Sequence, residues 1–218
     1  EFRRVLFRST RLQIIQEALN RANRPDLVSE ARLWLNMFLE GQYRNQDWPF
    51  AMKTVTLPVS QGASIPADYL RSRSALLNVG TNKLPILFLT PEQYDALRMA
   101  HNSPTMPNKV YVDQYERTFN WVPAPNGSYS FELRYYFMPE LPDPYSPIGD
   151  SETPLWYVDD DLLIQAVYIR ALEYDDDARF DKESQRLDKM LMESKLNSPD
   201  FRATTNRIKL GKSYRRRL

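Results

Sequence analysis

Two segments near the start of the chain repeat apolar residues at the spacing of an amphipathic helix. In the first, TRLQIIQEALNRANRPD, Ile15 and Leu19 share one face with their neighbours one turn away. The second is PDLVSEARLWLNMFLEGQY. We expect Pro25 to open this helix, because its missing N–H is not needed there, and Gly41 to end it. The pattern predicts a helical pair within residues 10–50.

In the middle of the chain the pattern changes to a two-residue alternation. Its clearest stretch is YSFELRYYF, where Tyr129 and every second residue after it lie on one face and Tyr136 lies on the outer face. Another strand, Leu84–Leu89, leads into the capping-box sequence TPEQ, which begins at Thr90. We therefore expect residues 51–140 to form a mainly antiparallel β module.

Helical spacing returns after a proline-rich connector at residues 141–154. The stretches DDDLLIQAVYIRALEY and DARFDKESQRLDKMLMESKL predict a second helical pair within residues 155–197. The two pairs could pack together around their apolar faces. The expected fold class is α+β: an antiparallel helical bundle built from N- and C-terminal helices, with the β module inserted and residues 198–218 as an extended C-terminal arm.

Composition narrows the possible functions. The chain of 218 residues has no cysteine, which excludes disulfides and thiolate chemistry and fits folding in a reducing cytosol. No apolar run approaches the roughly 20 residues that span a bilayer. Hydrophobic residues make up 42% of the chain and charged residues 26%, which is ordinary for a globular protein.

Charge is distributed unevenly. Residues 201–218 contain seven basic residues and no acidic one. The whole chain has 29 basic and 28 acidic residues, so the first 200 residues carry 22 and 28, a net charge of −6. An acidic body therefore ends in a basic segment.

The basic segment also carries apolar residues between its charges. It is compatible with a solvated terminus, with a nucleic-acid-binding arm, or with an arm that docks on an acidic protein. The apolar residues favour docking, since apolar anchors add a specificity that phosphate contacts lack. The candidate docking residues are Phe201, Arg202, Arg207, Ile208, Lys209, Leu210, Lys212, Tyr214, Arg215, Arg216, Arg217 and Leu218.

Motifs for catalysis or metal binding are weak. The single histidine, His101, is expected at the surface, because no cysteine is available to complete a zinc site. The sequence LGKS resembles the end of a P-loop, but the first glycine of that motif is replaced by Asn206. The acidic runs Asp159–Asp161 and Asp175–Asp177 fit helix N-termini better than a catalytic carboxylate pair. We expect no catalytic residue, metal or cofactor.

The first nine residues, EFRRVLFRS, resemble the translation of a common sequencing-library adapter. We expect this segment, residues 1–9, to be non-native and leave it out of the fold prediction. Residues 10–200 then carry 19 basic and 27 acidic groups, a net charge of −8.

The order of these segments resembles the head-to-tail connector (adaptor, or neck) proteins of tailed bacteriophages, especially short-tailed ones. The resemblance lies in LQIIQEALNRANRPD, EARLWLNMFLEGQYRNQDWPF, IPADYLRS, FNWVPAPNGSYSFELRYYFMPELP and DDLLIQAVYIRALEYDDD. It covers most of residues 11–195 and rests on the pattern and order of segments.

The resemblance implies a non-enzymatic structural protein of the virion neck, assembled in the host bacterial cytoplasm. It implies a ring of about twelve copies between the portal protein and a tail or nozzle protein. Helices would surround a channel through which packaged DNA passes without sequence-specific binding, and the ring would help to retain that DNA. A C-terminal arm would dock on the portal, and Arg202–Leu218 occupies that place here.

Two other functions stay open at this stage. One is a virion cell-wall hydrolase that uses paired carboxylates, and the other is a DNA-binding protein that uses its basic segment.

Overall fold

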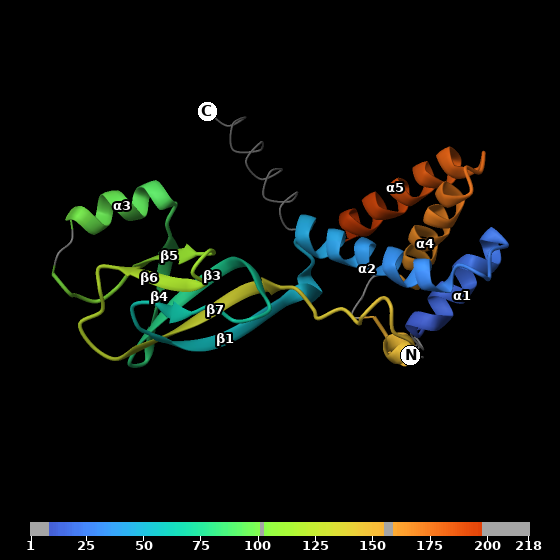
Figure 1. Ribbon diagram of the computed structural model, residues 1–218. Coiled ribbons are helices and arrows are strands. Elements are labelled where there is room, and N and C mark those ends of the chain that lie inside the picture. Colours follow the sequence, from blue (N-terminus) through green and yellow to red (C-terminus); the bar gives the residue numbers. More distant parts are fainter. Residues whose placement is uncertain (1–8, 101–102, 155–158, 198–218) are drawn as a thin grey trace, which may run out of the picture. The chain divides into compact units, whose positions relative to one another are not determined.

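The computed structural model describes residues 9–100, 103–154 and 159–197. The chain folds into two compact units (Figure 1). The helical unit is formed from Glu1–Phe50 and Pro139–Leu218, and the sheet unit is Ala51–Met138.

The helical unit is organised around one central helix. Its helices are α1 (Arg11–Ala22), α2 (Val28–Asn45), α4 (Asp160–Tyr174) and α5 (Phe180–Asn197), with the short 3-10 helix η2 at Pro147–Ser151. Helices α1, α2 and α5 each pack against α4. The largest part of the core comes from Ile14, Ile15, Leu19, Leu35, Leu162, Leu163 and Val167.

Local hydrogen bonds set where these helices begin. Thr10 and Gln13 form a capping box that satisfies free N–H groups of α1, and the Asp159 side chain accepts from the backbone N–H of Asp161. The prediction for α2 is wrong at both ends, because this helix begins after Leu27 and continues past Gly41. It continues because Tyr43, one half-turn beyond the glycine, is buried in the core.

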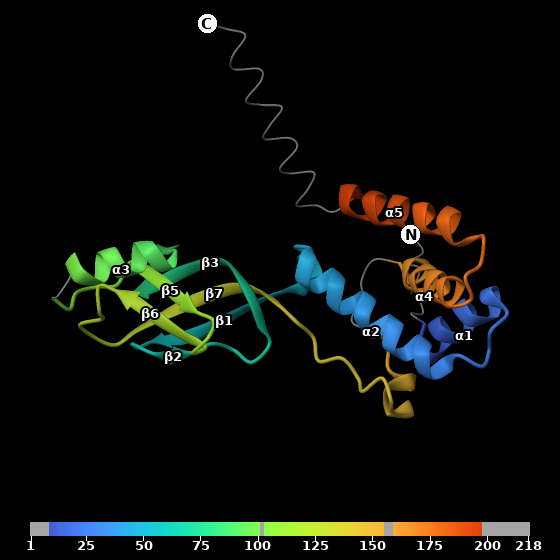
Figure 2. The same ribbon diagram turned by 45° about the horizontal axis from the view of Figure 1, so that its top comes forward.

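The sheet unit contains a seven-stranded sheet in the order β1-β7-β3-β4-β5-β6-β2 (Figures 1 and 2). The strands are β1 (Met52–Val59), β2 (Ala63–Ser64), β3 (Tyr69–Val79), β4 (Asn82–Phe88), β5 (Lys109–Asp113), β6 (Thr118–Val122) and β7 (Tyr129–Phe137). A short 3-10 helix, η1 (Pro49–Ala51), precedes β1, and α3 (Pro91–Ala100) joins β4 to β5. The predicted capping box of α3 is confirmed by the reciprocal bonds between Thr90 and Gln93.

The core of the sheet unit is aromatic. Phe131 lies edge-on to both Phe119 and Trp121, with ring centroids 5.4 and 4.8 Å apart. The alternation predicted for β7 is present, but the prediction that Tyr136 faces outward is wrong, because this residue is only 2% exposed. The Arg71 guanidinium lies 5.1 Å from its ring centroid and contributes to that cover.

The predicted fold class is also wrong. The described residues form five α-helices and a mixed, nearly closed, barrel-like sheet, not an antiparallel helical bundle with a small antiparallel insertion. The sheet is mixed because α3 carries the chain from β4 to the start of β5, which makes that pair parallel. The bundle is absent because α5 adds no fully buried residue to a shared core among residues 180–196.

Candidate functional site

Helix α4 holds the helical unit together. Every residue from Leu162 to Ile169 is buried, so the helix is covered on all sides rather than along one stripe. One of these residues is polar: Gln165 donates to the backbone oxygen and to the side chain of Glu183, at 3.3 and 2.9 Å. A buried amide on α4 therefore anchors the start of α5.

Helix α5 is covered on one side only. Leu187 and Leu191, on the side towards α4, are half-buried, whereas Met192 is 63% exposed and Leu196 is also exposed. Because this helix packs mainly against one neighbour, Met192 and Leu196, which lie one turn apart, form an apolar patch without cover within the described residues. An apolar surface of this kind on a helix is typical of a protein-binding face.

A groove of about 360 Å³ runs between α2, α4 and α5. Its apolar lining includes Phe38, Ile169 and Leu187, and Arg170 and Glu173 form part of its polar rim. On α2 the groove passes over Gly41, where no atom lies within 4 Å of the position that a Cβ would take. The groove is the first candidate assembly surface.

On the other side of α2, the proline-rich segment of residues 139–154 is fastened to the helices. Arg32 makes a two-bond ion pair with Asp150, at 2.9 and 2.5 Å, and the Asn36 amide donates to the Pro142 carbonyl at 2.7 Å. A Cβ on Gly149 would lie 2.3 Å from a Pro142 ring carbon, so only glycine fits there. The inner side of this segment is thus held rigidly.

A buried arginine lies beneath the same segment. Arg11 is 2% exposed, and its guanidinium donates to the Arg32 carbonyl and to the Asn36 side chain. Burial lowers the pKa of Arg11, and the nearby carboxylate of Asp150 opposes that shift. A cavity of about 120 Å³ adjoins Arg11 and is closed by Glu140 and other residues of the segment. These contacts position the segment.

The outer side of the segment presents two large apolar side chains. Tyr145 is 80% exposed and Ile148 is 84% exposed. The turn that carries them is ordered by its own hydrogen bonds, from the Tyr145 N–H to Asp143 and from the Ile148 N–H to Ser146. This turn is the second candidate assembly surface. Sequence reasoning missed it, although two large apolar residues within PDPYSPIGD were a visible signal.

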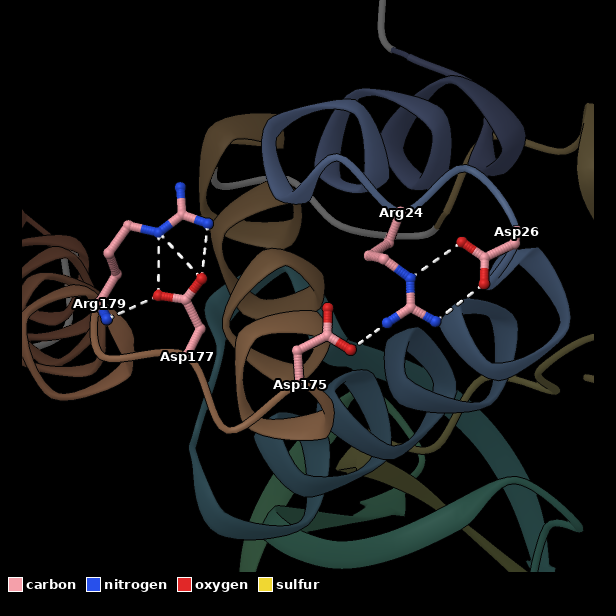
Figure 3. A network of polar contacts seen from close by, with 5 residues as sticks. All are labelled: Arg24, Asp26, Asp175, Asp177 and Arg179. Carbon is pink, nitrogen blue, oxygen red and sulfur yellow. Dashed lines mark hydrogen bonds and ion pairs between the residues drawn. The ribbon is translucent and has the colours of Figure 1, made fainter.

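A polar network links the α1–α2 turn to the α4–α5 turn (Figure 3). Arg24 pairs with Asp26 and Asp175, which raises its pKa, and its guanidinium lies over the ring of Tyr174. In the second turn, hydrogen bonds from Arg179 lower the pKa of Asp177 to about 2. Such a shift is opposite to the raised pKa that a general acid needs.

Two polar side chains of the sheet unit, Tyr135 and Asp68, bind each other and have a structural role. The Tyr135 hydroxyl donates to Asp68 at 2.9 Å, and burial followed by this bond raises the pKa of Tyr135 to about 12. Burial alone would raise the pKa of Asp68, but hydrogen bonds from Lys53 and Tyr135 outweigh it and lower that pKa. Among the exposed apolar residues, Leu87 lies on β4, Met99 on α3 and Tyr115 in the turn between β5 and β6.

The sequence-predicted docking residues, Phe201–Leu218, lie outside the described residues, as does His101. The two acidic runs are at the two ends of α4, so the structure does not bring them together. In the described part of the chain, no group of three or more metal-ligating side chains forms a metal site. No helix in that part is long and apolar enough to cross a membrane.

The geometry therefore consists of a rigid helical core, two apolar surfaces on it, and acidic groups engaged by arginines, which fits a protein that acts by binding other proteins. The sequence matches the SU10 adaptor protein family over residues 9–210. The match extends over most of the chain, which therefore belongs to this family of bacteriophage structural adaptor proteins, components of the virion. The family implies a non-enzymatic role and contacts with other virion components such as the portal or tail. No curated protein matches the chain.

Proposed function

We propose that this protein joins the portal to the tail in the virion neck. Copies of the chain form a ring, of about twelve subunits by the resemblance to neck proteins, and the ring helps to retain packaged DNA. The single observation that carries the proposal is membership of the adaptor family over residues 9–210. The incompletely covered side of α5 supports it, since a ring needs apolar surface that one copy alone leaves exposed.

The basic C-terminal segment is the proposed portal-docking element. In this proposal Phe201, Ile208, Leu210 and Tyr214 act as apolar anchors, and Arg215–Arg217 pair with carboxylates of the portal. A few buried residues carry most of the binding energy at protein interfaces, and Tyr and Arg are frequent among them. Residues 10–200, with 19 basic and 27 acidic groups, would present DNA with a surface that does not hold phosphate.

Particle mass tests the portal contact. The full chain mixed with its cognate portal ring is expected to add the mass of a ring of subunits, and a version ending at Asp200 is expected to add none. Two matched variants of the segment separate its parts. Replacing Phe201, Ile208, Leu210 and Tyr214 by serine keeps every charge, and replacing Arg215–Arg217 by alanine keeps every anchor. A mass gain that survives removal of residues 201–218 would contradict the docking role.

The same samples separate this function from DNA binding. A DNA-binding protein would hold duplex DNA at physiological salt, with an affinity that falls steeply as salt rises. The proposed adaptor is expected to hold little duplex DNA under those conditions. Tight, salt-sensitive binding that disappears in the Arg215–Arg217 variant, without any portal contact, would replace the adaptor proposal.

A further inference from the structure

The groove between α2, α4 and α5 passes over a glycine, Gly41, at a position where a residue with a side chain would stabilise the helix more. Gly41 lies inside α2, where glycine costs about 1 kcal/mol relative to alanine. No neighbouring atom of the chain needs that space, since none lies within 4 Å of a Cβ at this position. The fold of one copy therefore does not require glycine at position 41. Close approach of another chain to the backbone of α2 would account for it, because glycine leaves room for such an approach.

The turn at Tyr145–Ile148 has the opposite shape. It is a protrusion whose base is fastened by the Arg32–Asp150 ion pair and whose tip is apolar. A tip that is already ordered loses little conformational entropy when it is bound. Aromatic side chains presented in this way are frequent anchors of protein interfaces.

The groove and the protrusion lie on opposite sides of the helical unit. Helical spacing places Met37, Gly41 and Asn45 on one face of α2, which lines the groove. Asn36 and Tyr43 point to the other face, which adjoins the segment carrying the turn. In both views of the ribbon, α5 lies on one side of α2 and α4, and the yellow-orange turn around η2 lies on the other (Figures 1 and 2).

We propose that Tyr145 and Ile148 of one copy insert into the groove over Gly41 of the next copy. Two different surfaces on opposite sides of one chain make a heterologous contact, which closes into a ring when the rotation between copies allows it. An enclosed cavity of about 150 Å³ holds a benzene ring. A groove of about 360 Å³ therefore has room for a phenol ring together with an aliphatic side chain.

The charges at the rim are compatible with this pairing. Residues 139–154 contain four acidic residues, Glu140, Asp143, Asp150 and Glu152, and no basic one, and Asp150 is paired with Arg32. At the rim of the groove, the half-exposed guanidinium of Arg170 donates from Nη1 to Glu173. A guanidinium has five N–H donors, so an acidic turn that approaches Arg170 can share it with Glu173. The inference rests on the proposed ring and names the contact that builds it.

Assembly of the full chain, with and without the portal ring, tests this contact by particle mass. Tyr145→Ser with Ile148→Ser removes the protrusion, and Gly41→Arg fills the groove, whereas Gly41→Ala is the matched control that leaves the groove open. The first two variants are expected to weaken association at least about 30-fold, the loss caused by truncating an interface hot spot. Gly41→Ala is expected to assemble as the unchanged chain does.

Mixing distinguishes a head-to-tail contact from any other. Each defective variant alone is expected to stay monomeric. The Gly41→Arg variant keeps its protrusion, and the variant with Tyr145→Ser and Ile148→Ser keeps its groove. An equimolar mixture is therefore expected to give a 1:1 dimer and nothing larger. Absence of that dimer while the unchanged chain assembles would overturn the inference and leave the ring proposal standing.

Cysteine cross-linking gives a readout that does not depend on strong association. The chain has no cysteine, so Tyr145→Cys and Met37→Cys introduce unique thiols. The mixture of these two variants is expected to form a disulfide-linked heterodimer at high protein concentration, and Tyr115→Cys, on the sheet unit, serves as the exposed control. Lack of the cross-link between positions 145 and 37 would overturn the proposed contact. An unchanged chain that stays monomeric with and without the portal would instead overturn the ring proposal.

Discussion

Helices α4 and α5 follow each other in the chain, yet they are built in opposite ways. Helix α4 is buried from Leu162 to Ile169, whereas α5 has no fully buried residue among positions 180–196. Ten of the fifteen residues of α4 are apolar or aromatic, against six of the eighteen residues of α5. The difference teaches that the apolar residues of α4 stabilise the fold of one copy, while Met192 and Leu196 on α5 remain exposed within the described residues.

The largest expected effect comes from truncating a buried residue of α4. Leu163→Ala leaves a cavity in the core around this helix and is expected to cost about 3 to 4 kcal/mol of unfolding free energy. The matched change on α5, Leu196→Ala, is expected to cost less than about 0.5 kcal/mol, because that side chain is exposed. Denaturant unfolding of both variants measures the difference. Equal losses would show that α5 is as much a part of the folded core as α4.

The next largest effect on stability is expected from the ion pair that holds the proline-rich segment of residues 139–154 to α2. Asp150→Ala leaves the Arg32 guanidinium without its partner and is expected to cost about 2 to 3 kcal/mol, somewhat less than a fully buried pair because both side chains touch solvent. Ile148→Ala, two residues away on the exposed tip, is expected to be neutral. Thermal unfolding of the two variants separates them. A large loss from Ile148→Ala would mean that the tip contributes to folding of the single copy.

A smaller effect is expected where α4 and α5 meet. Gln165→Leu removes the bonds to Glu183 and is expected to cost about 1 to 2 kcal/mol. Hydrogen exchange is expected to speed up for the amides of α5 while those of α1 stay protected. Arg170→Ala, at an exposed position just beyond the buried stretch of the same helix, is the control. Faster exchange throughout α1 would show that the two helices unfold as one unit.

The smallest expected effect is a pH dependence at the turn between α4 and α5. Because Arg179 lowers the pKa of Asp177 to about 2, below the usual value near 3.8, this ion pair stabilises the fold above about pH 4. Its contribution is lost as the pH falls from about 4 through 2. The stability difference between the unchanged chain and Asp177→Asn is expected to be constant at pH 5–7 and to shrink below pH 4. A difference that grows in acid would contradict this sign.

Local features were predictable from the sequence, and contacts between distant segments were not. The capping box of Thr90 and Gln93 depends on residues three apart, so its sequence sufficed. The parallel pairing of Leu87 with Lys109 depends on where α3 returns the chain, which no local pattern records. The burial of Tyr136 also depends on a neighbouring strand, because Arg71 covers it.

The candidate functional site also has features that the sequence predicts and features that it does not. A basic segment with apolar anchors is a property of composition and was visible at once. The groove over Gly41 was not visible, because the glycine suggested the end of a helix when it lies inside one. Arg11 was unremarkable in the sequence, since a charge in the first turn of a helix is normally exposed, and its burial depends on a segment more than a hundred residues away.

The pairing of β1 with β7 has a consequence for engineering. The chain enters the sheet unit through β1 and leaves it through β7, and these strands are in register from Met52 opposite Tyr136 to Val59 opposite Tyr129. Paired antiparallel positions lie only about 5 Å apart. The sheet unit thus begins and ends at neighbouring points, as domains that tolerate grafting do. It is a natural cassette: a short loop could join its two ends for separate production, and another domain with adjacent termini could be spliced in its place.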